Sequence, residues 1–245
     1  MTKAGGQCGG PDEGALLALF RAIDSRDDLE IVRRLDSSRD IANRPIRIGA
    51  SRHDAETYFL AAIRHYVYGG DTALHIAAAA HQRQLAESLV ARGADVRARN
   101  RRGAQPLHYA ADASPGGEHW DPVAQGDVIT YLIEAGADPN ALDKSGVAPL
   151  HRAVRTRCAA AVSALIDSGA APQLMNKHGS TPLHLAVQST GRSDSGSAAA
   201  KDEQGRIIAV LLQHGASPTD ADANGKTVAA AASSDWIRDL LGIPR

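Results

Sequence analysis

Aromatic residues and net charge are both scarce in this sequence. Aromatic residues make up only 4% of the 245 residues, whereas hydrophobic residues make up 43%, so the core must consist mainly of small aliphatic side chains. The 27 Lys and Arg residues nearly balance the 28 Asp and Glu residues, which leaves a formal charge of -1. A general nucleic-acid binder or a polybasic membrane protein normally carries clustered excess positive charge, so this balance argues against both classes.

Cysteine and long apolar runs are scarce as well. The two cysteines, Cys8 and Cys158, are too few for a disulfide framework and match no metal-ligand spacing, so we expect two free thiols. No apolar run approaches the roughly 20 residues that a membrane-spanning helix needs. The segment from Met1 to Gly14 has one Lys and no apolar stretch, unlike a secretory signal. These absences predict a cytoplasmic protein with no membrane contact.

A Leu-His pair recurs four times along the chain. The pairs begin at residues 74, 107, 150 and 183, and each is followed one residue later by an Ala. A Gly-Ala pair recurs in step with them, beginning at residues 93, 136, 169 and 215. The basic spacing is 33 residues, and two longer intervals carry their extra residues between a Leu-His pair and the following Gly-Ala pair. The sequence is therefore a tandem repeat with an insertion inside two of its units.

Each repeat predicts two short helices. The step Gly179-Ser180-Thr181-Pro182 supplies a turn and a helix start, because the Thr hydroxyl can cap free amides and Pro fits the first helical turn. A second apolar stretch with helical spacing follows in each unit and ends at a Gly such as Gly136. Two helices of this length cannot bury their apolar stripes alone, but stacked copies form a continuous core.

The repeated pattern Gly-x-Thr-Pro-Leu-His-x-Ala-Ala, followed by a second helix and Gly-Ala-Asp-x-Asn, resembles the ankyrin repeat, in a bacterial-type member with two insertions. The resemblance implies an all-α ankyrin-repeat solenoid of helix-turn-helix units joined by short hairpin-like tips. It also implies that the repeated His forms hydrogen bonds within the turns.

The repeat frame predicts one ankyrin-repeat domain over residues 14–245, after a flexible tail of residues 1–13. An irregular link, residues 37–69, precedes the full repeats, and its segment Ala55–Tyr66 has helical spacing, so we expect one helix there. The remaining units are an N-terminal cap at 14–36, full repeats at 70–102, 103–145, 146–178 and 179–224, and a C-terminal cap at 225–245. Ser234 to Leu241 is expected to form the closing helix.

The two insertions differ in composition. The first, residues 113–126, places Glu118, His119, Trp120 and Asp121 together, and we expect Trp120 to anchor this loop on the stack, with contact to a ligand or an ion as the alternative. The second, residues 191–205, begins Gly/Ser-rich and is expected to be flexible, while Ala198 to Gln204 is expected to lengthen the following helix.

Little in the sequence points to catalysis. The four repeated histidines lie one per unit, so stacking separates them by about 10 Å, and they cannot share one metal ion. The sequence contains no Gly-x-Ser-x-Gly elbow, phosphate-binding loop or dinucleotide fingerprint. We therefore expect no catalytic residue, metal or cofactor. Cys158 lies near Arg155 and Arg157, which could lower its pKa, but we expect a buried bystander thiol.

The resemblance implies a non-catalytic module that binds another protein through its concave face and tips. The residue after each Leu-His pair, and the residue three positions later, are expected to face the concave groove. A tip with several arginines suits an acidic surface or peptide, and a monomer is favoured while the oligomeric state stays open. The expected partner-binding residues are Ile76, Tyr109, Asp112, Arg152, Arg155, Leu185 and Gln188, with Arg99 and Arg102 at a tip and Trp120 in the first insertion.

Two alternatives stay open. One is an enzyme with a site near residues 113–126, assembled from Asp112, His119, Asp121 and Arg155, since fold does not dictate function. The other is a nucleic-acid contact through the arginines of residues 97–102, for which a steep loss of binding with salt would be the signature.

Overall fold

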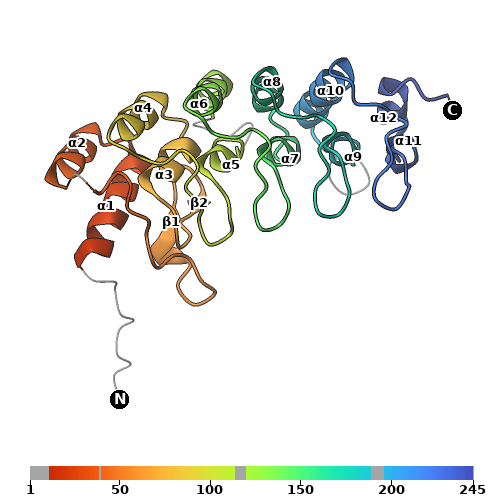
Figure 1. Cartoon of the computed structure of the whole chain (residues 1–245). Helices are drawn as coiled ribbons and strands as arrows, with labels where there is room; N and C mark the ends of the chain where they lie inside the picture. The colour runs from red at the N-terminus through yellow and green to blue at the C-terminus, as the bar shows by residue number, and fades with distance from the viewer. Residues whose placement is uncertain (1–10, 39, 114–119, 189–195, 245) are drawn as a thin grey trace.

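Helices stack side by side in two rows in the computed structural model, which describes residues 11–38, 40–113, 120–188 and 196–244 (Figure 1). This arrangement confirms the all-α solenoid that the repeats predict. The inner row, next to the tips, contains α1 (Pro11–Ser25), α3 (Ala73–Ala79), α5 (Pro106–Ala110), α7 (Pro149–Arg155), α9 (Pro182–Ala186) and α11 (Val228–Ala231). The outer row contains α2 (Asp28–Ser37), α4 (Arg83–Ala91), α6 (Pro122–Glu134), α8 (Ala159–Asp167), α10 (Ala198–Gln213) and α12 (Asp235–Leu240).

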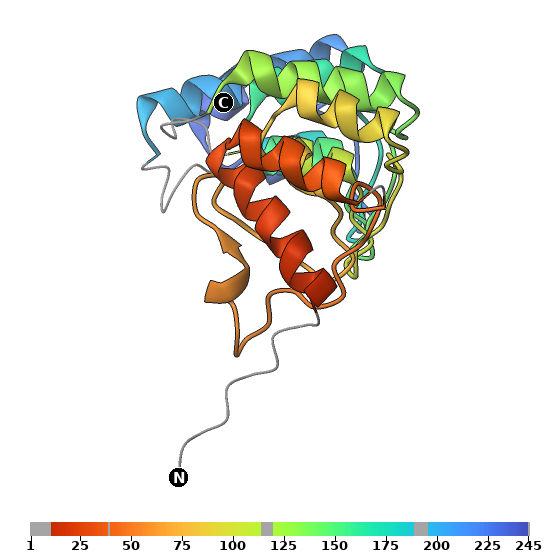
Figure 2. The same cartoon turned by 90° about the vertical axis from the view of Figure 1, so that its left-hand side faces the viewer.

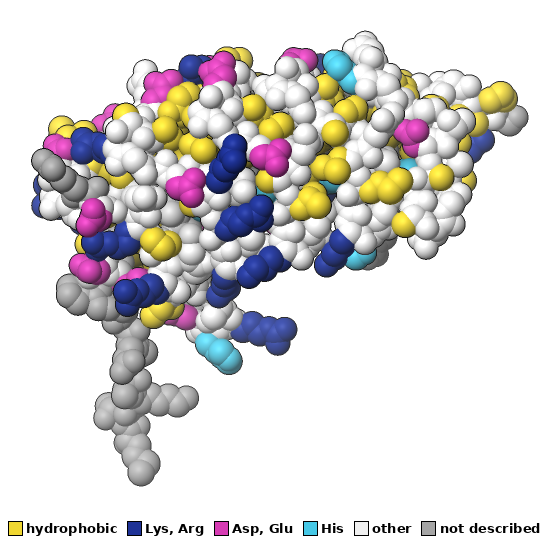
Figure 3. Space-filling model, in the orientation of Figure 1, with side chains coloured by type: hydrophobic (Ala, Val, Ile, Leu, Met, Phe, Trp, Pro, Cys, Tyr) yellow, Lys and Arg dark blue, Asp and Glu magenta, His cyan; other side chains and the backbone are white. Residues whose placement is uncertain are grey.

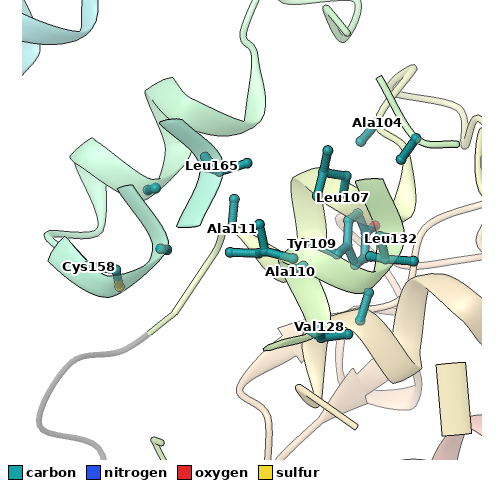
Figure 4. Close-up of a cluster of buried hydrophobic side chains, with 14 of the residues drawn as sticks. Ala104, Leu107, Tyr109, Ala110, Ala111, Val128, Leu132, Cys158 and Leu165 are labelled. Atoms are coloured by element: carbon teal, nitrogen blue, oxygen red, sulfur yellow. The ribbon is translucent and has the colours of Figure 1, made fainter. Parts of the chain in front are cut away.

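Small aliphatic side chains build the core, as the composition predicts. The repeated Leu of each inner helix is buried, and so are the repeated alanines that follow it. In the second full unit, Ala110 and Ala111 lie in the same buried cluster as Leu107, Val128 and Leu132 (Figure 4). Alanines at these shared positions let neighbouring inner helices approach closely, so the core runs without a break from unit to unit.

Three of the four repeated histidines connect their inner helix to the next unit, whereas Nε2 of the fourth, His151, is buried without a hydrogen-bond partner. His75 accepts a hydrogen bond from the amide of Thr72 at Nδ1, and its Nε2 lies 3.2 Å from the carbonyl oxygen of Ala104. The equivalent Nε2 contacts of His108 and His184 are 3.1 and 3.0 Å long, to carbonyl oxygens of the following unit. These bonds agree with a structural role for the three histidines, because both ring nitrogens are occupied by backbone groups.

The tips are tight turns that bond to one another. In the first of them Asn100 accepts hydrogen bonds from the amides of Arg102 and Ala104, at 2.9 and 3.1 Å, and the same turn recurs at Asp143, Asn176 and Asp222. Backbone bonds join the first tip to the second, from Lys144 to the carbonyl of Arg102 at 2.9 Å, and the third to the fourth, from Ala223 to the carbonyl of Gly179 at 3.3 Å. Side chains at equivalent tip positions therefore form a row across the molecule.

The helices at both ends of the chain and after the second insertion agree with the predicted ones, except that the first helix begins earlier than expected. α1 begins at Pro11, inside the stretch that was expected to be flexible, and the rest of that stretch lies outside the described residues. α10 begins at Ala198, which confirms the lengthened helix, and α12 is the predicted closing helix. The centres of the two insertions, residues 114–119 and 189–195, lie outside the described residues, so their predicted mobility stays untested.

The expected helix over Ala55–Tyr66 is wrong. This segment forms a 3-10 turn, η1 (Glu56–Tyr58), and an antiparallel pair of short strands, β1 (Phe59–Leu60) and β2 (His65–Tyr66). Aromatic side chains favour strands because they pair across them, and the rings of Phe59 and Tyr66 lie 4.8 Å apart. In the view of Figure 2 the hairpin lies on one side of α1 and the tips lie on the other.

The irregular link is an enlarged tip between α2 and α3. Its two ends pair with each other, since the amide of Ile46 donates to the carbonyl of Asp71 at 2.8 Å and that of Ala50 to Val67 at 2.7 Å. We call residues 46–71 the N-terminal cover.

Within the part of the chain that the structure describes, no helix is long and apolar enough to cross a membrane.

Candidate functional site

The structure places two of the expected groove residues in the core. Tyr109 is 1% exposed and Ile76 is 0% exposed, so neither faces an open groove. The hydroxyl of Tyr109 donates to the carboxylate of Asp71, 2.8 and 2.9 Å from its two oxygens, and accepts from the side-chain amide of Asn100 at 2.9 Å. The expectation that Tyr109 and Ile76 face the groove is therefore corrected.

The N-terminal cover is the physical reason for this correction. The ring of His65 packs on Tyr109 with 4.3 Å between centroids, and the ring of Tyr68 lies under the guanidinium of Arg102 at 4.1 Å. Burial, with the neighbouring charge of Asp71, raises the pKa of Tyr109 well above its usual value. The inner face of the first two full units is thus covered by the chain itself.

Arg152 and Asp112, both expected at the groove, are bound to each other. The Arg152 guanidinium contacts Asp112 Oδ2 at 2.7 Å and Asp143 Oδ2 at 2.9 Å, and its side chain is 15% exposed. Burial alone would raise the pKa of Asp143, but hydrogen bonds from Arg152 and from the amides of Val147 and Ser145 lower it overall. This two-carboxylate clamp joins two adjacent units and holds Arg152 in place.

A cavity of about 600 Å³ lies between α1, the hairpin and the inner helices of the first two full units. Its walls include the charged or polar side chains of Asp24, Arg26, Arg64, His65, His81, Asp112 and Trp120. Burial lowers the pKa of His65 to about 4 and also lowers that of His81, so both imidazoles are neutral at pH 7. No group of His, Cys, Asp and Glu that could hold a metal ion occurs among the described residues.

The residues of the enzyme alternative do not come together in the described part of the chain. Asp112 is paired with Arg152, and Asp121 caps α6 by accepting from the amides of Val123 and Ala124 at 2.8 and 3.2 Å. Arg155 lines a different cavity, and His119 lies outside the described residues. Trp120 is half-buried against the core and donates to Gln125 Oε1 at 3.0 Å, a contact that fits the expected anchor.

The second cavity brings three expected site residues together. It has a volume of about 200 Å³ and lies between α7, α9 and α10, where Arg155, Leu185 and Gln188 meet. The sequence interpretation missed a further wall residue, Gln204, which is buried. A signal for it was present, because a Gln-Gly pair ends both insertions, at Gln125 and at Gln204.

Basic side chains occupy the row of tips. Several of them are exposed and make no ion pair with a described carboxylate, among them Arg99, Arg102, Lys144 and Lys177. Arg99 is nevertheless fixed, since its Nη1 donates to the carbonyls of Leu142 at 2.9 Å and Gly103 at 3.2 Å. Separate Lys and Arg side chains are visible across this face of the molecule (Figure 3).

Cys158 is a buried thiol, as the sequence interpretation expected. Its side chain is fully buried, and burial raises its pKa to about 11. The neighbouring arginines therefore do not activate it, because the thiolate is the reactive form and is disfavoured here. Cys8 lies outside the described residues.

Comparison with known families agrees with the repeated geometry. Three family models match: ankyrin repeats (many copies) over residues 60–110, ankyrin repeats (3 copies) over residues 123–195, and a single ankyrin repeat over residues 178–223. No curated protein matches the chain significantly. The matched residues together make up more than half of the sequence and include the four Leu-His pairs, the tips between them and the helices from α3 to α10. The chain therefore belongs to the ankyrin-repeat family.

Proposed function

We propose that this chain is a non-catalytic module that binds an acidic segment of another protein through its basic tips and the uncovered part of its inner face. Ankyrin repeats are generally protein-protein interaction modules and are typically non-catalytic. The observation that carries the proposal is the row of exposed basic side chains at the tips, Arg99, Arg102, Lys144 and Lys177, without carboxylate partners in the described structure.

This row supports recognition of carboxylates because its guanidinium groups are already oriented. Arg99 is held by two carbonyl oxygens and Arg102 by the ring of Tyr68. A fixed guanidinium offers planar paired donors to a carboxylate and loses less side-chain entropy on binding than a mobile one. An acidic peptide lying across the tips would meet Arg102 and Lys144 on adjacent turns.

The uncovered part of the inner face is the C-terminal half. Arg155 and Gln188 are exposed there and Leu185 is half-buried, whereas the cover closes the first two full units. We therefore assign direct partner contact to Arg155, Leu185 and Gln188, and a supporting role to the clamp of Arg152 and Asp112. Trp120 borders the large cavity and stays in the proposed contact surface as a secondary member.

A nucleic-acid partner is the second candidate, since phosphates would also fit the basic row. The overall charge of -1 favours the protein partner, because a nucleic-acid binder usually carries excess positive charge. The enzyme alternative has the weakest support, because Asp112 and Asp121 are already used in an ion pair and a helix cap.

Affinity capture from native extract tests the proposal. The tip variant carries Arg102→Ala with Lys144→Ala, and the control variant carries Arg33→Ala with Arg206→Ala, which removes the same charge from outer-row helices. We expect an acidic protein that is captured by the wild type and the control variant and lost from the tip variant. Capture of nucleic acid with a steep salt dependence, or equal capture by both variants, would overturn the proposal.

A further inference from the structure

Where no insertion separates an inner helix from the following outer helix, the inner helix ends with the same backbone hydrogen bond. In the first full unit the amide of Gln82 donates to the carbonyl of Ala77 at 3.0 Å, and in the third the amide of Cys158 donates to Ala153 at 3.0 Å. The residue before each donor, His81 or Arg157, has a positive φ that turns the chain back. A backbone donor therefore closes the helix where the chain passes directly to the outer row.

Inner helices followed by an insertion cannot end in this way, and a glutamine side chain replaces the backbone donor. Gln125 Nε2 donates to the carbonyl of Ala110 at 3.0 Å, and Gln204 Nε2 donates to the carbonyl of Ala186 at 2.6 Å. Both acceptor alanines occupy the repeat position of Ala77. The two glutamines are thus equivalent in position and in their bond to the repeated alanine, and Gln204 Nε2 also donates to the carbonyl of Gln188 at 2.8 Å.

The two glutamines differ at their other side-chain atom. Gln125 Oε1 accepts a hydrogen bond from the indole nitrogen of Trp120 at 3.0 Å. Gln204 Oε1 is buried and has no hydrogen-bond partner, and the whole residue is 2% exposed. An unpaired buried acceptor is costly. Gln105 Oε1 is also buried and unpaired but lines neither cavity, whereas Gln204 lines one and so has room for a partner.

The space beside Gln204 is the small cavity of about 200 Å³. This volume lies below the roughly 300–1,000 Å³ of sites for whole small molecules, so one inserted side chain is the occupant that fits. Val154, Leu185 and Ile207 form its apolar walls, while Arg155 and Gln188 are exposed at its rim. The occupant must therefore combine an apolar body with one hydrogen-bond donor.

An indole meets these requirements better than the other donor side chains. It donates through its nitrogen and has no acceptor that burial would leave unpaired, unlike the amides of Asn and Gln or the hydroxyl of Tyr. A Lys ammonium would face Arg155 and Arg157 in the same cavity wall. An aromatic ring also gains from a guanidinium, such as that of Arg155, that lies over its face.

We propose that the cavity between α7, α9 and α10 binds a tryptophan side chain of the partner protein, whose indole N–H donates to Gln204 Oε1. The intramolecular pair of Trp120 and Gln125 is the same contact made within the chain. This inference rests on the proposed function in taking the partner to be a protein. It adds a specific anchor, distinct from the basic tips, to that interaction.

N-acetyl-tryptophanamide, titrated into the full chain and followed by NMR, tests the inference. We expect it to shift the side-chain amide signals of Gln204 and the signals of Leu185, and we expect its 1-methyl-indole analogue to bind roughly tenfold more weakly because the N–H is missing. Gln204→Met should abolish binding of the probe, and Gln125→Met, which loses the equivalent bond to the backbone, should keep it.

Equal binding of the two probes, or shifts confined to other regions, would overturn the inference, and this comparison needs only the wild-type chain if Gln204→Met does not fold. The outcome of the probe titration can be told apart from the outcome of the capture experiment that tests the proposed function. Loss of the captured partner from the tip variant, together with no probe binding at Gln204, would refute the tryptophan site and leave the interaction module standing. Probe binding without any captured protein would refute the module instead.

Discussion

The hydroxyl of Tyr109 donates to both carboxylate oxygens of Asp71, at 2.8 and 2.9 Å, in the closed interior between two repeats. Tyr109→Phe should lower the free energy of unfolding by about 1–3 kcal/mol, because a buried carboxylate loses a donor. Urea unfolding measures this change. The control is Tyr66→Phe, a hairpin residue that is 40% exposed and should change stability by less than about 0.5 kcal/mol. If Tyr109→Phe lowered the free energy of unfolding no more than Tyr66→Phe does, the buried hydroxyl would contribute nothing to stability.

Gln125→Met should destabilise the fold by about 1–3 kcal/mol, because it leaves the carbonyl of Ala110 and the indole nitrogen of Trp120 without partners. Methionine keeps a similar size and helix propensity, so the loss reflects the hydrogen bonds. Thermal unfolding checks the change against Gln84→Met, an exposed position on α4. A wild-type melting temperature for Gln125→Met would rule out the replacement of a backbone donor by this side chain.

Stability should fall as the pH is lowered from about 6.5 to about 4. Burial lowers the pKa of His108 to about 4, and the same holds for His65, whereas an unfolded histidine titrates near 6.5. The unfolded chain therefore takes up protons first, and each buried histidine removes stability over this window, on the order of 2 kcal/mol by pH 5. Urea unfolding at pH 7.5 and pH 5 measures the loss. A flat or rising stability toward pH 5 would contradict the buried, neutral histidines.

Two tip glycines form a matched pair. Gly146 and Gly225 both have positive φ, 64° and 79°, but a Cβ on Gly146 would lie 2.6 Å from Lys177 Cβ, whereas one on Gly225 would meet nothing within 4 Å. Gly225→Ala should therefore cost only the backbone strain, about 1–2 kcal/mol. Gly146→Ala should cost more, since it also pushes the next tip away, and the difference in unfolding free energy between the variants measures the close approach. Equal costs would mean that the tips do not pack against one another.

The repeat architecture was predictable from the sequence because its determinants are local and recur. Each Leu-His pair and each closing Gly specifies a helix start or a helix end within a few residues, and stacking then follows from the shared alanines. The enlarged tip was not predictable in this way. The spacing of apolar residues over Ala55–Tyr66 suits a helix as well as a hairpin, and the pairing of its ends with each other decides between them.

The sequence predicted the exposure of a site residue correctly only where the repeat pattern alone determines whether its side chain is exposed. Arg155 and Gln188 are exposed as expected, because nothing in the described structure covers their units. Tyr109 is buried by the ring of His65, which comes from the N-terminal cover and not from a repeat. Gln204 was missed because its importance arises from a bond to Ala186 across an insertion, and its signal, the Gln-Gly pair shared with Gln125, lies outside the 33-residue repeat pattern.

The dissociation constant of the captured partner tests the central claim most directly. We predict that the tip variant, Arg102→Ala with Lys144→Ala, binds this partner roughly thirty-fold more weakly than the wild type, if each cation contributes about 1 kcal/mol. Its unfolding free energy should fall by no more than about 1 kcal/mol, through loss of the contact between Arg102 and the ring of Tyr68. The control variant, Arg33→Ala with Arg206→Ala, loses only exposed ion pairs within single helices and should bind like the wild type. Wild-type affinity in the tip variant, or an equal loss in both variants, would contradict recognition through the basic tips.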